Sequence, residues 1–289
     1  MAAPKQLGDP IEGPERRLEA ERAGLRALVK RFRQRPFSCR SLGVLGIALL
    51  ISWRAVSQLD QALPPAEQAE AGQALAKKWR DALPAENAEY KGALKIRNSD
   101  GQTDSVPLTF KIIVGETSWQ TVYEASASAR TAAQKLIIIH TPGKPNEYLF
   151  AGGVKPGDAA GKPVRLTNDQ AAVPFAGSDF WLMDLGLEFF HWPTQRLIKT
   201  EMRAGQVTKV LESVNPHAGG GYARVVTWLE KESGAPILAE AYGPDNKVLK
   251  QFSIKHVKKV AGHYQLQEMQ IRNLRTDSRT RIEYDFDKQ

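Results

Sequence analysis

Apolar residues recur at every second position in much of the chain after Pro84, and this alternation constrains the fold more than any other feature. In Val106–Val114, for example, Val106, Leu108 and Phe110 fall on one side of an extended chain. A period of two is that of a β-strand with one buried face. Strands are predicted at Tyr90–Ile96, Val106–Val114, Trp119–Ala125, Leu136–Ile139, Tyr148–Phe150, Val207–Ser213, Tyr222–Glu230, Pro236–Tyr242, Val248–Lys255, Tyr264–Arg272 and Arg279–Asp287.

Short turns, such as Gly243-Pro244-Asp245-Asn246, separate several of these strands, and helices are too few for parallel crossovers. The predicted fold class is therefore mainly β (α+β). We expect a curved antiparallel sheet, or incomplete β-barrel, of about eleven strands with helices covering its concave face. Gly152–Pro163 is predicted to be a loop.

Two of the predicted strands carry additional signals. In Tyr264–Arg272 the apolar phase shifts between Leu266 and Met269, which predicts a β-bulge. In the last strand Glu283, Asp285 and Asp287 share one face. Three carboxylates at this spacing suit a cation or an acid–base pair, but the pattern is more typical of the solvated side of an edge strand.

One long helix is predicted before the first strand, over Gln58–Leu83. Pro64-Pro65 suit its first turn and Pro84 stops it. Ala71, Leu75, Trp79 and Leu83 recur about every four residues and form an apolar stripe that needs a partner surface.

The aromatic segment, Phe180–Trp192, is the most apolar stretch between the predicted strands. It is either a helix that covers the core or a lid over an apolar cavity, and both descriptions hold if the lid closes when empty. With the stripe of the long helix, it supplies the candidate residues for binding an apolar ligand: Phe180, Trp181, Leu182, Leu185, Phe189, Phe190, Trp192, Leu75 and Trp79.

No motif for covalent or metal chemistry is found. The five histidines form no HExxH pattern, no serine lies in GxSxG, and Gly219-Gly220-Gly221 lacks the ending of a phosphate-binding loop. His256 and His263 lie across a turn from each other and are typical of surface residues. We therefore expect no enzyme, no cofactor and no metal site.

The formal net charge of +8 is concentrated at the amino-terminal end. Met1–Arg54 holds eleven basic and five acidic residues, whereas the remainder is nearly balanced. A nucleic-acid groove would need basic residues clustered in the folded domain, so no nucleic-acid partner is expected.

Residues 1–57 are predicted to be a basic leader with a signal peptide, and residues 58–289 the mature domain. Ten basic residues precede the uncharged stretch Leu42–Trp53, and Ala55-Val56-Ser57 offers a cleavage site after Ser57. Arg54 is awkward for cleavage, so a retained anchor at residues 42–53 stays open. Cys39 precedes the apolar stretch, so cleavage would leave a chain without cysteine.

The carboxy-terminal half resembles bacterial outer-membrane lipoprotein-sorting proteins of the LolA-like superfamily. The resemblance covers roughly Asp60–Asp287. Its motifs are Gly177-Ser-Asp-Phe180, Asp184-Leu185, Tyr222-Ala-Arg-Val-Val-Thr-Trp-Leu-Glu-Lys, Pro236-Ile, Glu240-Ala-Tyr242, Asp245-Asn-Lys-Val-Leu-Lys250, Lys258-Lys-Val260-x-Gly262, Met269-x-Ile271-x-Asn273 and Arg279-Thr280.

The resemblance implies an incomplete barrel whose helices cover a cavity for acyl chains, and a periplasmic location. We expect a monomeric carrier for lipid or lipoprotein acyl chains that serves lipoprotein sorting to the outer membrane. An inner-membrane transporter or an outer-membrane receptor would be its partners. The alternative is a membrane-anchored sensor of envelope lipid or lipoprotein state with the same fold.

Overall fold

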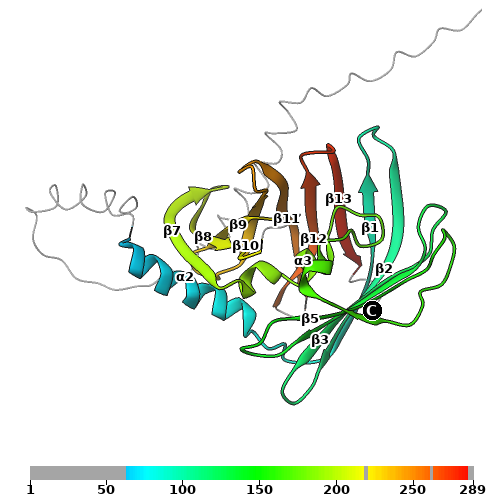
Figure 1. Ribbon diagram of the computed structural model, residues 1–289, viewed down its shortest axis with the longest axis horizontal. Helices are drawn as coiled ribbons and strands as arrows, with labels where there is room; N and C mark the ends of the chain where they lie inside the picture. The colour runs from blue at the N-terminus through cyan, green and yellow to red at the C-terminus, as the bar shows by residue number, and fades with distance from the viewer. Residues whose placement is uncertain (1–62, 218–220, 261–262, 286–289) are drawn as a thin grey trace, which may run out of the picture. The chain divides into compact units, whose positions relative to one another are not determined.

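The computed structural model describes residues 63–217, 221–260 and 263–285, and its thirteen strands form one antiparallel sheet (Figure 1). The strands are β1 (Ala88–Arg97), β2 (Thr103–Val114), β3 (Trp119–Ala125), β4 (Gln134–His140), β5 (Glu147–Gly152), β6 (Val164–Leu166), β7 (Thr194–Arg203), β8 (Gln206–Val214), β9 (Arg224–Glu230), β10 (Pro236–Tyr242), β11 (Val248–Val260), β12 (His263–Asn273) and β13 (Ser278–Asp285). The helices are α2 (Pro65–Arg80), α3 (Leu182–Leu185) and the 3-10 turns η2 (Asn168–Ala171) and η3 (Glu188–His191).

The strand order is β6-β5-β4-β3-β2-β1-β13-β12-β11-β10-β9-β8-β7, and the sheet stays open because its edges β6 and β7 do not pair with each other. Strands that pair in the sheet follow one another in the sequence except at one point, where the first strand pairs with the last. Gly92 allows β1 and β13 to lie this close, since a Cβ there would be 2.1 Å from the carbonyl oxygen of Glu283. The predicted fold class is confirmed.

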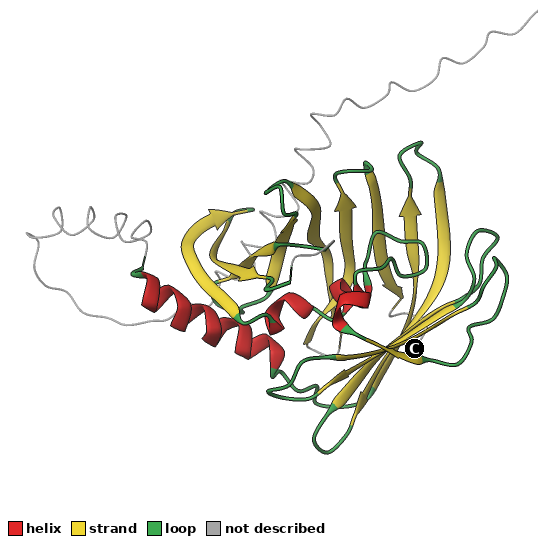
Figure 2. Cartoon of the chain, in the orientation of Figure 1, coloured by secondary structure: helices red, strands yellow, loops and turns green. Residues whose placement is uncertain are grey.

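The main core lies on the inner face of the sheet, between the strands and the short helices (Figure 2). Alternation along β9 illustrates how the sequence builds it. Val225 and Leu229 point into the main core, whereas Val226 and Trp228 belong to a smaller apolar cluster on the outer face.

Helix α2 packs against β7, and its two buried residues, Gly72 and Ala76, lie beside the predicted apolar stripe rather than in it. Ala76 is fully buried, and Gly72 approaches so closely that a Cβ would lie 2.6 Å from the Cα of Arg196. The helix is shorter than the predicted Gln58–Leu83. It begins with Pro65 in the first turn and ends at Arg80, short of Leu83, the residue in which Pro84 disfavours helical geometry. Residues 58–62 lie outside the described part of the chain.

Two strands, β6 and β7, were not predicted. β6 has only three residues, too few to establish a period. In β7 the register with β8 shifts between Leu197 and Lys199, so the alternation of apolar residues is interrupted. The bulge predicted in β12 is confirmed, because the β11–β12 register shifts around His256 and Glu268.

The prediction that the final strand is an edge strand was wrong. β13 lies in the interior of the sheet, between β1 and β12, with Glu283 on the face opposite the core. Pairing between the two ends of a domain leaves no local signal in the sequence. Asp287 and the predicted leader, residues 1–57 with its cleavage site and possible anchor, lie outside the described residues.

Candidate functional site

The aromatic segment lies on the inner face of the sheet, but it is not one helix. It forms the single turns α3 and η3, separated by Gly186-Leu187, where Leu187 adopts a left-handed backbone with φ of 49°. All nine predicted lipid-binding residues belong to the main core or pack against it. The buried ones are Phe180, Leu182, Leu185, Phe189, Phe190 and Trp192, and the half-buried ones are Trp181, Leu75 and Trp79.

Helix α2 contacts the aromatic segment at its far end. The rings of Trp79 and Phe190 stack with centroids 5.9 Å apart, and the Trp79 indole donates a hydrogen bond to the carbonyl of Gly234. Gln73 also donates to the carbonyl of Pro193, immediately after the segment. Leu75 and Trp79 of the predicted stripe therefore pack against the core, whereas Leu83 lies beyond the end of the helix and is 63% exposed.

Three buried polar links hold the aromatic segment to the sheet, and the first is made by Asp179, the residue before it. Its carboxylate accepts hydrogen bonds from the hydroxyls of Ser278 and Thr280 on β13. Its backbone N–H donates to the Thr280 oxygen at 2.9 Å. The start of the segment is thus fixed to the middle of the sheet.

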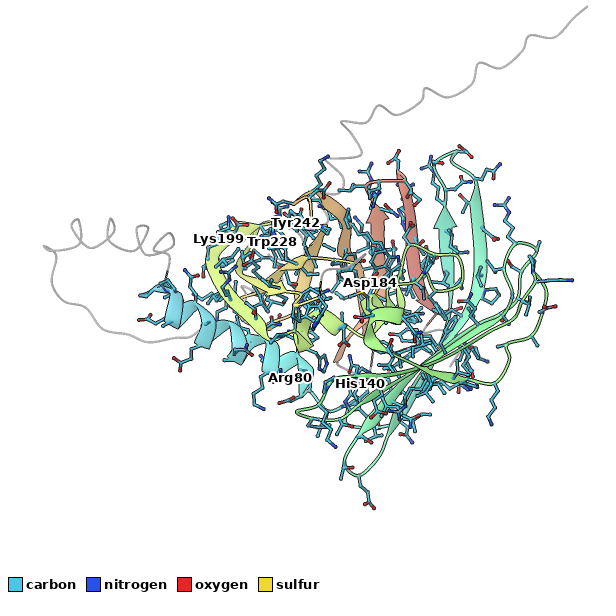
Figure 3. The ribbon with its side chains drawn as sticks, in the orientation of Figure 1. Arg80, His140, Asp184, Lys199, Trp228 and Tyr242 are labelled. Carbon is cyan, nitrogen blue, oxygen red and sulfur yellow. The ribbon has the colours of Figure 1, made fainter. Side chains whose placement is uncertain are left out.

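The second link centres on Asp184 in α3 (Figure 3). Its carboxylate accepts hydrogen bonds from the Trp181 backbone N–H at 2.8 Å and from the Tyr222 hydroxyl at 2.9 Å. The ammonium of Lys250 on β11 lies 3.4 Å from Asp184 and donates to the carbonyl of Asp179 at 2.7 Å.

Aromatic rings complete this second link. Trp181 stacks on Tyr222 with ring centroids 4.6 Å apart, and Lys250 Nζ lies 3.7 Å from the centre of the Trp181 ring. Burial lowers the pKa of Lys250, while the charge of Asp184 opposes that shift. Burial and the adjacent Asp184 charge raise the pKa of Tyr222 well above its usual value.

The third link is made by Glu188 in η3, whose side chain is only 5% exposed. Its carboxylate accepts hydrogen bonds from the Tyr148 hydroxyl at 2.8 Å and from the Asn146 amide at 3.1 Å. The same amide donates to the carbonyl of Gly186. Burial raises the pKa of Glu188 to about 7, against the opposing effect of the two hydrogen bonds.

Replacing Glu188 with glutamine should stabilise the protein at pH 8 by roughly 2–3 kcal/mol. A carboxyl whose pKa is higher in the folded state than its ordinary 4.5 favours folding when protonated, so its contribution is lost as pH rises from about 4.5 to 7. The glutamine side chain would keep an acceptor for both donors and carry no charge. Urea unfolding of both proteins between pH 5 and 8 measures the difference.

Two neighbouring histidines make the comparison between variants necessary. Burial lowers the pKa of His140 and of His191 from 6.5 to about 4. The free energy of unfolding therefore falls as pH drops from about 6.5 to 4, because the unfolded chain takes up these protons first. Their contribution cancels in the difference between Glu188→Gln and the unchanged protein. The exposed Glu116→Gln is the matched control, and an equal pH-dependent gain in that variant would contradict the assignment.

An apolar cavity lies between the aromatic segment and the strands β9–β12. Its volume is about 40 Å³, measured as the space open to the centre of a water molecule, which corresponds to roughly three waters. It is lined by Asp184, Leu187, Phe189, Tyr222, Val225, Thr227, Pro236, Ala239, Ala241, Lys250, Phe252 and Ile271. Of the nine predicted residues, only Phe189 lines it. The others fill the surrounding core.

A second hollow, of about 190 Å³ by the same measure, lies beside the aromatic segment and is partly polar. Asp169, Glu188, His191, Asn215 and His217 contribute to its wall. This hollow is larger than the first, but its polar lining suits an apolar chain poorly.

Sequence reasoning missed the polar partners of the aromatic segment. Asp184 was recognised only as an ionisable residue within it, and Tyr222 and Lys250 only as parts of quoted motifs. Partners that lie 38 and 66 residues from Asp184 in the chain leave no local pattern that would join them.

Two further observations concern the described residues alone. The described residues contain no group of three His, Cys, Asp or Glu side chains placed to hold a metal ion. The Nδ1 atom of His256 lies 2.8 Å from a carboxylate oxygen of Glu268. No helix among them has the length and apolar character needed to cross a membrane.

Comparison with known proteins supports the fold. The model of a family described as "uncharacterized protein" matches residues 132–287. A DUF1329 family protein from Desulfovibrio piger superposes with a TM-score of 0.61 at 16% identity, covering 76% of this chain and 92% of that one. No curated protein matches the sequence.

Two other solved structures superpose over 75% of this chain and 91% of their own. One, from Vibrio parahaemolyticus, is described as a candidate outer membrane lipoprotein-sorting protein domain, with a TM-score of 0.60 and 20% identity. The other is a LolA superfamily protein from Nitrosomonas europaea, with a TM-score of 0.52 and 15% identity. At these identities the likeness establishes the fold, which is LolA-like.

Proposed function

Because the chain belongs to the family whose model matches residues 132–287 and has a LolA-like fold, we propose that it is a periplasmic carrier of acyl chains. It binds lipid or lipoprotein acyl chains for sorting or transport to the outer membrane and performs no covalent chemistry. An inner-membrane transporter and an outer-membrane receptor act as donor and acceptor, and the carrier works as a monomer. The basic leader before an uncharged stretch supports the location.

The observation that carries this proposal is the apolar cavity beneath the aromatic segment. Its wall combines small side chains of β10, Ala239 and Ala241, with the aromatic rings of Phe189 and Phe252. Polar groups gather around one place in the lining, where Asp184, Tyr222 and Lys250 meet. An apolar hollow with a small polar cluster is the usual chemistry of a site for amphipathic ligands.

The energetics require that the aromatic segment moves. Exposing a chain of ~16 carbons to water costs on the order of 13 kcal/mol, so a carrier must bury most of it. A cavity with room for roughly three waters cannot do so. In this proposal the structure corresponds to the closed state, and binding shifts the equilibrium toward an open state in which the segment leaves the inner face.

Filling the cavity should weaken acyl binding without unfolding the protein. Ala239 lies on the inner face opposite Thr227 and Phe252, so Ala239→Leu places its side chain in the hollow. Native mass spectrometry of the protein purified from cells should detect bound acyl lipid. The variant should carry at least ~10-fold less, since each excluded methylene loses about 0.8 kcal/mol.

A matched substitution separates the effect of filling the cavity from a general loss of stability. Ala93→Leu makes the same change on the outer face, where Ala93 lies opposite Glu283, and should leave the bound lipid unchanged. If the unchanged protein carries no lipid and binds no fluorescent fatty acid, the carrier proposal fails.

A further inference from the structure

The apolar cavity has one oppositely charged pair in its lining, and its two members belong to parts of the fold that separate in the opening proposed above. Lys250 lies on β11 in the interior of the sheet, paired with Ala241 of β10 and Asn273 of β12. Asp184 lies in α3, within the aromatic segment. Among the described residues that line the cavity, these two are the one cation and the one carboxylate.

In the closed state, most of what stabilises the Lys250 ammonium comes from the aromatic segment. A carboxylate oxygen of Asp184 lies 3.4 Å from Nζ, and the centre of the Trp181 ring lies 3.7 Å from it. Both groups leave with the segment. The carbonyl of Asp179, at 2.7 Å from Nζ, stays, because the side chain of Asp179 is hydrogen-bonded to β13.

The carboxylate of Asp179 does not take the place of Asp184. It is already the acceptor for the hydroxyls of Ser278 and Thr280. Burial lowers the pKa of Lys250, and the charge of Asp184 opposes this shift more than the charge of Asp179 does. A buried ammonium that loses its main counterion is costly, so the open state favours a ligand that brings a negative charge to Lys250.

The donors that remain on the inner face are those that hold a carboxylate in the closed state. The hydroxyl of Tyr222 lies 2.9 and 3.0 Å from the two carboxylate oxygens of Asp184 and donates to them. Tyr222 is 1% exposed, and both it and Lys250 line the cavity. A second carboxylate can therefore use the same hydroxyl and ammonium, with charge-assisted hydrogen bonds of the same kind.

Thr227 on β9 gives a second, independent indication of a polar group on the ligand. Its side chain lines the same cavity and is fully buried. Its hydroxyl oxygen has no hydrogen-bond partner among the residues that the structure describes. Buried polar groups are almost always hydrogen-bonded in folded proteins, so this hydroxyl indicates contact with a polar atom from outside the chain. A ligand with a polar head can supply such an atom, whereas a bare hydrocarbon cannot.

We propose that the cavity takes acyl chains that end in a free carboxylate, and that this carboxylate replaces Asp184 as the partner of Lys250 and Tyr222 when the aromatic segment leaves. The inference rests on the proposed function and narrows its ligand to fatty acids, because an ester- or amide-linked acyl chain has no carboxylate to offer. It also names what compensates opening: the ligand restores the ion pair that the segment gives up.

Calorimetric titration with dodecanoate and with 1-dodecanol tests the inference, using the full chain as it accumulates in cells after removal of copurified lipid. The two ligands share one chain and differ in the head. The readout is the ratio of their two Kd values, compared between proteins so that the different hydration of the heads cancels. Lys250→Met should shift this ratio against dodecanoate by about 10-fold or more, the loss of a hydrogen bond between charged groups.

Two controls separate the headgroup contact from the loss of the buried ion pair. Asp184→Asn breaks the same pair but keeps the ammonium, so its Kd ratio should stay close to that of the unchanged protein. Lys247→Met removes a positive charge just before β11, where the side chain is 81% exposed, and should change neither Kd. Tyr222→Phe removes the second donor and should shift the ratio against dodecanoate by about threefold, which provides a second test if Lys250→Met does not fold.

The outcomes distinguish this inference from the proposed function. An unchanged ratio in Lys250→Met and Tyr222→Phe, an equal shift in Asp184→Asn, or binding of dodecanol without dodecanoate would overturn the inference and leave an acyl carrier. If the unchanged protein binds neither ligand, the carrier proposal fails and the inference fails with it.

Discussion

Replacing Asp184 with leucine is expected to lower the free energy of unfolding by about 3–5 kcal/mol, the range for breaking a buried ion pair. Lys250 is only 3% exposed and would lose the Asp184 carboxylate, keeping its hydrogen bond to the Asp179 carbonyl and the smaller effect of the Asp179 charge. The hydroxyl of Tyr222 would also lose its acceptor. Urea unfolding followed by tryptophan fluorescence measures the loss.

A double-mutant cycle identifies the ion pair as the cause. Lys250→Met removes the buried charge, so the double variant Asp184→Leu/Lys250→Met should be at least as stable as Asp184→Leu alone. Strictly additive losses would show that the two side chains do not depend on each other, and would remove the second link from this account.

Replacing Phe190 with alanine is expected to cost about 3–5 kcal/mol, the range for deleting a buried aromatic side chain. Phe190 is 1% exposed, and its ring stacks on that of Trp79 in α2 with centroids 5.9 Å apart. Its ring also contacts that of Phe189 in the same turn, tilted at a centroid distance of 4.5 Å. Its loss opens a cavity where α2, η3 and the sheet meet. The same urea titration measures the effect.

Phe150→Ala provides the comparison, because Phe150 packs against the same core but is only half-buried. It should cost clearly less than Phe190→Ala. Equal losses, or a loss below ~1 kcal/mol for Phe190→Ala, would contradict the role of Phe190 as the contact between α2 and the aromatic segment.

The strands were predictable where one face is buried and the alternation is unbroken. The predicted bounds of Trp119–Ala125 and Pro236–Tyr242 agree with β3 and β10. β7 escaped prediction because a bulge interrupts its period, and the interior position of β13 escaped because β1, its partner, lies at the other end of the domain. Local periodicity reports burial, whereas long-range pairing depends on the whole chain.

The candidate site was predictable in one respect. The density of aromatic residues identified Phe180–Trp192 as a cover for the inner face, and the structure places it there. The links through Tyr148, Tyr222 and Lys250 could not be predicted, because each joins distant parts of the chain. The cavity volume depends on how all these side chains pack, which no local pattern encodes.

Hydrogen exchange with and without a bound fatty acid tests most directly whether the aromatic segment moves off the sheet to admit an acyl chain. On binding, backbone amides of Leu182–Trp192 should exchange faster, while those of β9–β12 should keep or gain protection. Unchanged exchange in that segment, with the fatty acid bound, would contradict the account.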